Sequence, residues 1–135
     1  MFDEFSLEVF IIKIKVKGYL ENKANDEKLL IDTFGIRNKK NLSYKQEDVI
    51  YKIKIFDNKI ILIRENSDFI NTFIFEKNKN TKSEYYLKKY ATNIDIELRT
   101  QELFIDDEKI EIRYIIKDTS EEYHYIIEMS EKLWV

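Results

Sequence analysis

One arginine follows an apolar run in a segment that alternates like a β-strand. Residues 59–65 have the sequence KIILIRE and residues 49–56 the sequence VIYKIKIF, with the turn Asp57-Asn58 between them. With a two- or four-residue hairpin loop, Tyr51 faces Arg64 on the same side as the isoleucines, whereas a three-residue loop would turn Arg64 outward. Because a guanidinium does not lose its proton, an arginine among apolar side chains needs a carboxylate, a cluster of acceptors or a bound anion.

Arg64 therefore allows two interpretations. In the first, it anchors an acidic ligand, and tyrosines on the inner face of the fold supply hydroxyls and ring faces. These tyrosines are Tyr44, Tyr51, Tyr114 and Tyr125. In the second and commoner arrangement, Arg64 is a structural latch at the end of the fold, paired with an internal carboxylate or reaching solvent. The tyrosines also suit ordinary core and rim positions, which is the more frequent use of such rings.

The other residues that could carry chemistry favour structural interpretations. His124 is the only histidine, and alternation places it on the outer face, which predicts a surface histidine and neither a catalytic base nor a metal ligand. The carboxylates Asp106–Glu108 could hold a hard cation, but they lie in a predicted hairpin turn, where such residues are common. The chain has no cysteine and only two glycines, Gly18 and Gly35, which excludes thiol chemistry and a glycine-rich phosphate loop. We expect no enzyme, no metal site and no cofactor.

The alternation of apolar and polar residues predicts an all-β chain with strands about every ten residues. The expected strands cover residues 10–19, 28–36, 42–45, 49–56, 59–65, 69–76, 93–105, 110–116 and 123–129. Residues 83–90 are a strand edge or a helical turn, and Gly18 suggests a bend or bulge in the first strand. Within residues 93–105 the inward positions are even-numbered as far as Leu98 and odd-numbered at Leu103 and Ile105, which predicts a β-bulge between Arg99 and Glu102.

Eight to ten such strands close most simply into an antiparallel up-and-down barrel, because closure removes the exposed edges. The length of 135 residues fits a single domain, residues 1–135, with residues 1–9 as a short helical or disordered lead-in. The start of the chain is acidic and unlike a signal peptide, and no apolar run approaches the ~20 residues of a membrane helix. We therefore expect a cytoplasmic protein that does not bind membranes.

Lysines alternate on the predicted outer face of two strands. They are Lys13, Lys15, Lys17, Lys52 and Lys54. Such stripes could bind RNA or a protein partner, but outward aromatic residues are not evident beside them, and solubility and edge protection explain them as well. The net charge of −3 gives no overall attraction to nucleic acid. Nucleic-acid binding is therefore not expected, and a homodimer stays an open alternative.

Four residues resemble positions of the YwiB-like family of uncharacterised bacterial proteins. Gly35 ends the second expected strand, Tyr44 lies in the third, Arg64 follows the run IILI, and Thr100 lies in the stretch YATNIDIELRTQEL. The resemblance extends over residues 27–130 and implies a lipocalin-like, or calycin, barrel. It implies no reaction, because the family has no established activity.

The chain departs from the family at two positions and from true lipocalins at one motif. Asn66 and Thr92 stand where the family usually has glycine, and the Gly-x-Trp motif of lipocalins is absent. An eight-stranded barrel has room for side chains or for one small ligand. The leading hypothesis is therefore a calycin-like barrel that binds a small, partly apolar ligand, with an anionic group as one option. The alternative is a solidly packed barrel that serves as a protein- or RNA-interaction module.

Overall fold

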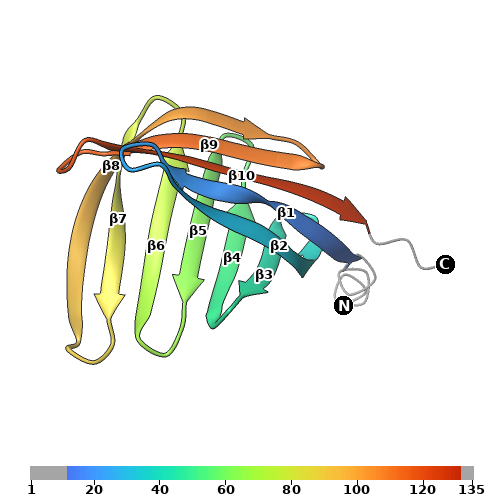
Figure 1. Ribbon diagram of the computed structural model, residues 1–135, viewed down its shortest axis with the longest axis horizontal. Coiled ribbons are helices and arrows are strands. Elements are labelled where there is room, and N and C mark those ends of the chain that lie inside the picture. Colours follow the sequence, from blue (N-terminus) through green and yellow to red (C-terminus); the bar gives the residue numbers. More distant parts are fainter. Residues whose placement is uncertain (1–11, 132–135) are drawn as a thin grey trace, which may run out of the picture.

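Ten antiparallel strands form one closed barrel (Figure 1). The computed structural model describes residues 12–131, so the lead-in expected at residues 1–9 lies outside the described residues. The strands are β1 Ile12–Asn22, β2 Glu27–Asn38, β3 Asn41–Gln46, β4 Val49–Ile55, β5 Lys59–Glu65, β6 Phe69–Glu76, β7 Asn80–Leu87, β8 Thr92–Ile105, β9 Lys109–Ile116 and β10 Glu121–Glu131. Each strand pairs with the next, and β1 pairs with β10, which confirms the predicted up-and-down barrel. Within residues 12–131 no helix is long and apolar enough to cross a membrane.

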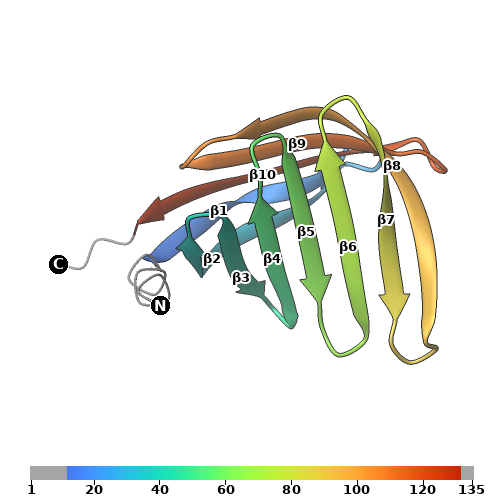
Figure 2. The same cartoon turned by 180° about the vertical axis from the view of Figure 1, so that it is seen from behind.

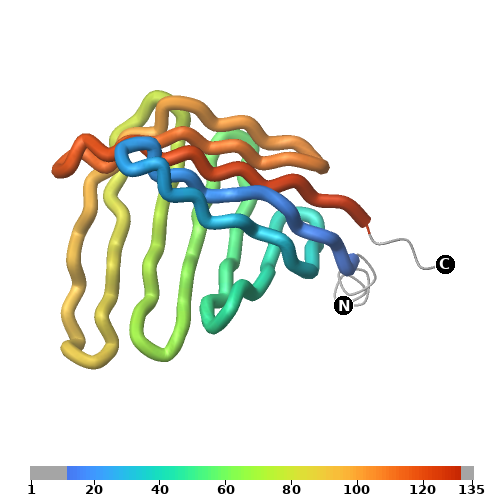
Figure 3. Tube along the Cα trace, in the orientation of Figure 1, coloured from blue at the N-terminus to red at the C-terminus, as the bar shows by residue number. Residues whose placement is uncertain are grey.

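The barrel is flattened into two layers whose strands cross steeply. Strands β3 to β7 stand side by side in one layer, and β9, β10, β1 and β2 run across them in the other (Figures 1 and 2). Strand β8 belongs to both layers, since its first part pairs with β7 and its last part with β9. Figure 3 shows how β8 rises beside β7 and then turns to follow β9. The register shifts between Thr100 and Glu102, so the predicted bulge is confirmed and lies at this corner.

The central hairpin has the predicted register. Tyr51 pairs with Arg64 across β4 and β5, and Ile53 pairs with Leu62, so the arginine faces inward. Residues 83–90, which had two interpretations, are mostly strand, because β7 runs to Leu87. Alternating side chains from nine of the ten strands build one apolar core, and β7 adds the buried Ser83. Its most completely buried apolar members are Val16, Leu42, Ile53, Ile60, Phe75, Leu98, Ile110, Ile112 and Ile127.

Gly18 lies at a close approach between two strands, where no bulge occurs. Its register is continuous with Ile31 on one side and with Ile127 on the other, so the expected bulge is wrong. A Cβ atom at this position would overlap the carbonyl oxygen of Ile126 on β10. Glycine is therefore required at position 18 because the backbones of β1 and β10 leave no room for a side chain.

Candidate functional site

Strand β5 ends directly after Arg64, and the turn that follows the strand positions this arginine. In this turn the Oδ1 atom of Asn66 accepts hydrogen bonds from the backbone N–H groups of Asp68 at 2.8 Å and Phe69 at 3.1 Å. The Nζ atom of Lys88 donates to the carbonyl oxygen of Asn66 at 2.7 Å and lies 3.3 Å from the Oε2 atom of Glu65. Asn66, which stands where the YwiB-like family usually has glycine, thus organises the turn through its side chain. The end of β5 is held between two neighbouring loops, so the direction of Arg64 is fixed.

The guanidinium of Arg64 lies between two aromatic rings and beside one amide. Its Cζ atom is 5.5 Å from the ring centroid of Tyr51 and 5.7 Å from that of Phe69, both distances at which a cation is attracted to a ring face. Its Nη1 atom donates a long hydrogen bond of 3.4 Å to the Oδ1 atom of Asn71. The Nε atom is buried without a hydrogen-bond partner, and no carboxylate of residues 12–131 forms an ion pair with Arg64. The charge is therefore held by neutral groups only.

The four tyrosines named from the sequence converge on the same space. The hydroxyl oxygens of Tyr44 and Tyr125 are 2.6 Å apart, and the rings of Tyr44 and Tyr51 are stacked with centroids 4.7 Å apart. Tyr114 contributes from β9, where its ring packs 4.9 Å from that of Phe75. All five candidate residues, Arg64 included, are thus brought together, although they come from β3, β4, β5, β9 and β10.

Electrostatics link the arginine to three tyrosines, one in its own layer and two in the opposite layer. Burial, the largest cause, raises the pKa of the Tyr44, Tyr114 and Tyr125 hydroxyls above the ordinary value. The positive charge of Arg64 acts in the opposite direction on the pKa of all three. Arg64 therefore lies within electrostatic reach of these hydroxyls. At neutral pH they stay protonated and can donate hydrogen bonds to an anion.

Three further polar residues lie on the inner face; Asn71 and Ser83 were missed from the sequence, and Thr100 was named for its resemblance to the family but not as a site residue. Asn71 is 1% exposed, and Ser83 and Thr100 are fully buried. The hydroxyls of Ser83 and Thr100 are buried without a hydrogen-bond partner. Asn71 could have been identified from the sequence, because it interrupts a row of inward aromatic residues. That row is Phe69, Asn71, Phe73 and Phe75.

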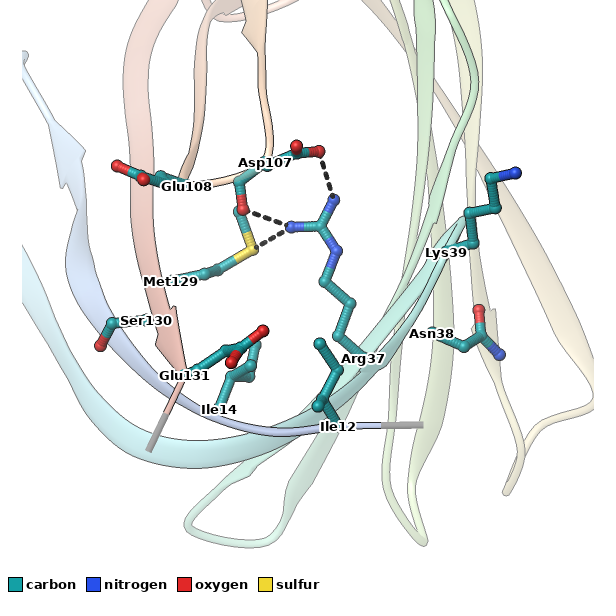
Figure 4. Close-up of a pocket in the computed structure, with 10 residues that line it drawn as sticks. All are labelled: Ile12, Ile14, Arg37, Asn38, Lys39, Asp107, Glu108, Met129, Ser130 and Glu131. Atoms are coloured by element: carbon teal, nitrogen blue, oxygen red, sulfur yellow. Dashed lines mark hydrogen bonds and ion pairs between the residues drawn. The ribbon is translucent and has the colours of Figure 1, made fainter. Parts of the chain in front are cut away.

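A second inward arginine closes the other end of the barrel. Arg37 continues the inner row of β2 and lies opposite Leu42 of β3. Figure 4 shows its side chain reaching across to the β8–β9 turn, where Nη1 donates to the carbonyl oxygen of Asp107 at 2.8 Å. Its Nη1 also contacts the sulfur of Met129 at 3.2 Å, and its Nη2 lies 4.0 Å from the Oδ1 atom of Asp107. The sequence prediction placed Arg37 outside the site. Its partners are 70 and 92 residues away along the chain, and no local pattern indicates them.

The cavity beside Arg37 has a volume of about 800 Å³. Its apolar lining includes Ile12, Ile14 and Met129, and its charged lining includes Asp107 and Glu131 (Figure 4). The two inner arginines thus differ in the partners of their guanidinium groups. Arg37 has a backbone carbonyl and a carboxylate as partners, whereas Arg64 has neither.

His124 is buried, contrary to the predicted surface position. It faces outward as alternation requires but is only 5% exposed. Its Nε2 atom is 2.6 Å from the Oε2 atom of Glu111, and its Nδ1 atom is 3.2 Å from the hydroxyl oxygen of Tyr19. The hydrogen bond with His124 is the main cause that lowers the pKa of Glu111. His124 therefore links β1, β10 and β9 on the outer face of the barrel.

The predicted turn carboxylates behave as turn residues. The Oδ1 atom of Asp106 accepts hydrogen bonds from the backbone N–H groups of Glu108 at 2.8 Å and Lys109 at 2.7 Å. This Asx arrangement accounts for the aspartate without a cation. Within residues 12–131 no three histidine, aspartate or glutamate side chains are grouped so that they could hold a metal ion.

The outer lysine stripes carry partners of their own. The Nζ atom of Lys15 is 2.6 Å from the Oδ1 atom of Asp32 and 4.5 Å from the ring centroid of Phe34, and Lys52 pairs with Glu65 at 3.9 Å. Phe34 is an outward aromatic residue that the sequence prediction did not identify. These contacts reduce the charge that the stripe can offer to a polyanion.

Comparison with known proteins bears on the fold. The structure is similar to the crystal structure of the YwiB protein from Bacillus subtilis, with a TM-score of 0.69 over 92% of this chain and 93% of that chain. The two chains share a fold. Their sequence identity is 20%, and at this level the likeness carries no information on ligands. No protein-family model matches the chain, and no curated protein matches it either.

Proposed function

We propose that the protein binds a small, partly apolar anion inside the barrel, with Arg64 as the anchor. The observation that carries the proposal is the buried Nε atom of Arg64, together with the lack of any ion pair from this arginine to the described residues. Leaving such a donor unpaired costs about 1–3 kcal/mol. A bound anion offsets this cost and gives the charge a function.

Arg37 shows how the same barrel neutralises an inner arginine with its own groups. At the other end of the same barrel, the chain satisfies an inner arginine with its own carbonyl and carboxylate groups. An arginine that served only as a latch at position 64 could be satisfied in the same way. Tyr51, Phe69 and Asn71 instead hold Arg64 in place without neutralising its charge.

The same observations support membership of the YwiB-like family with a calycin-type barrel. Tyr44 and Arg64 lie in the site, and Thr100 pairs with Tyr114 at its edge. Gly35 pairs with Tyr44, and a Cβ atom on it would approach the Tyr44 Cβ to 3.1 Å, so glycine allows this tyrosine its position. A cytoplasmic location, the lack of enzymatic activity and a possible dimer stay predictions.

Thermal unfolding with a panel of small anions tests the proposal. The panel pairs each carboxylate, sulfonate or phosphate ester with its neutral amide or alcohol, at constant ionic strength. Anions that bind the folded barrel raise the Tm of the wild type, and the stabilisation grows with the logarithm of the ligand concentration relative to Kd. The effect should disappear in Arg64→Gln and persist in Arg37→Gln, which is the matched control. A panel in which no anion acts, or in which Arg64→Gln responds like the wild type, would overturn the proposal.

A further inference from the structure

One edge of the Arg64 guanidinium has no partner among residues 12–131. Nη1 is engaged with Asn71, whereas Nε has no partner. The N–H groups of Nε and Nη2 lie on one edge of the planar group and point in parallel, so they can donate two hydrogen bonds to the two oxygens of one carboxylate. Arg64 is half-buried and its Nε atom is shielded. A carboxylate on this edge must therefore draw the guanidinium toward itself.

The paired tyrosines supply one more donor. In the hydrogen bond of 2.6 Å between Tyr44 and Tyr125, one hydroxyl donates and the other accepts. The hydrogen of the accepting hydroxyl is left for a third group, which must be an acceptor. The positive charge that acts on these tyrosines from the described residues is that of Arg64 alone. One cation and one spare hydroxyl suit a monoanion better than a phosphate dianion, which needs more donors.

The wall next to Arg64 is made of flat rings. Phe69 stacks on Tyr85 with ring centroids 5.2 Å apart, and Phe69 also contacts the guanidinium. Both rings are half-buried, and Ile94, which pairs with Tyr85, is 47% exposed although it continues the inner row. Beside the charge, the inner face at this end of β6, β7 and β8 is thus partly exposed at Phe69, Tyr85 and Ile94. A planar ring can stack on such a wall with its carboxylate directed to Arg64.

We propose that the ligand is an aryl carboxylate, with the carboxylate on the Nε–Nη2 edge of Arg64 and the aromatic ring against Phe69 and Tyr85. This inference rests on the proposed function and narrows the anion to one class.

Isothermal titration at pH 7 with four matched probes tests the class. The probes are 1-naphthoate, the saturated decahydronaphthalene-1-carboxylate, 1-naphthyl phosphate and the neutral 1-naphthalenemethanol. The naphthoate should bind about fivefold or more tightly than the saturated acid, because ring stacking adds to area burial. It should also bind more tightly than the phosphate, and the alcohol should show no binding. Equal or tighter binding of the saturated acid or the phosphate would overturn the aryl carboxylate and leave the anion site standing. If none of the three anions binds, the proposed function itself fails.

Three variants separate the parts of the site. Arg64→Lys keeps the charge but cannot form two parallel bonds, so the affinity for naphthoate should fall about tenfold or more. Tyr85→Leu should remove the preference for the aromatic over the saturated acid and leave the affinity for the saturated acid unchanged. Phe104→Leu changes an exposed ring elsewhere on the barrel and should have no effect. Retention of the aromatic preference in Tyr85→Leu would refute the stacking position.

Discussion

Replacing Arg64 by methionine removes its charge and its hydrogen-bond donors and keeps an unbranched apolar side chain of similar volume. The variant loses two cation–π contacts with Tyr51 and Phe69, worth about 0.5–1 kcal/mol each. It also loses a hydrogen bond of 3.4 Å to Asn71, which is too long to contribute much. Against these losses, the variant no longer buries an unpaired Nε donor, which gains about 1–3 kcal/mol. The free energy of unfolding without ligand should therefore stay within about 1 kcal/mol of the wild type or rise.

Arg37→Met is the matched comparison at the other end of the barrel. Arg37 donates to the Asp107 carbonyl at 2.8 Å and lies 4.0 Å from the Asp107 carboxylate. Loss of a charged hydrogen bond of this kind costs about 1.5–3 kcal/mol. Urea unfolding measures both variants, and with a slope of about 2 kcal/mol per molar urea, Arg37→Met should lower the midpoint by about 1 M. If Arg64→Met loses as much stability as Arg37→Met, Arg64 is a structural latch and the anion site is refuted.

Three further predictions concern the frame of the barrel. Gly18→Ala should cost about 3 kcal/mol or more in thermal unfolding, because its Cβ would overlap the Ile126 carbonyl oxygen; a stable variant would show that β1 and β10 can separate there. Ala91 has a φ of 48°, so Ala91→Gly should raise the free energy of unfolding by about 0.5–1 kcal/mol, and a loss of stability would contradict the strain. The pKa of Glu111 is lowered in the folded state, chiefly by His124, so its ionised form stabilises the fold above the unfolded pKa of about 4.3, and this contribution is lost as the pH falls through the folded pKa. Urea midpoints measured from pH 7 to pH 3 should therefore fall less steeply in Glu111→Gln than in the wild type, and identical slopes would rule out this linkage.

Much of the fold follows from local pattern. The side-chain period of a strand is two, so the alternation around Ile53 and Leu62 fixes which residues face inward, and the turn sets the register that brings Tyr51 to Arg64. The same parity argument locates the bulge, because a flip of the inward phase requires one extra residue. The convergence of the four tyrosines follows from these rows once the sheet closes.

Contacts between distant segments could not be predicted in this way. Alternation correctly placed His124 on the outer face but could not show that Tyr19, 105 residues away, packs there and helps to bury it. Arg37 was not among the candidate residues, because its partner Asp107 lies 70 residues further along the chain. Gly18 was expected to mark a bend or bulge in the first strand, whereas it is needed because the backbone of β10 approaches β1 closely at this position. In each case the missing information was which strand lies beside which.

Gln101 is the extra residue at the corner of β8, since Thr100 and Glu102 have successive partners on β9 and Gln101 has none. Deleting it would join Thr100 directly to Glu102, so the strand would alternate without interruption, and Leu103 and Ile105 would keep their places against the core. The deletion would instead remove the bulge that bends β8 where it passes from β7 to β9. The corner of the barrel thus depends on one residue that pairs with nothing. A single deletion at this position should leave the inward and outward faces unchanged and weaken the bend of β8 between the two layers.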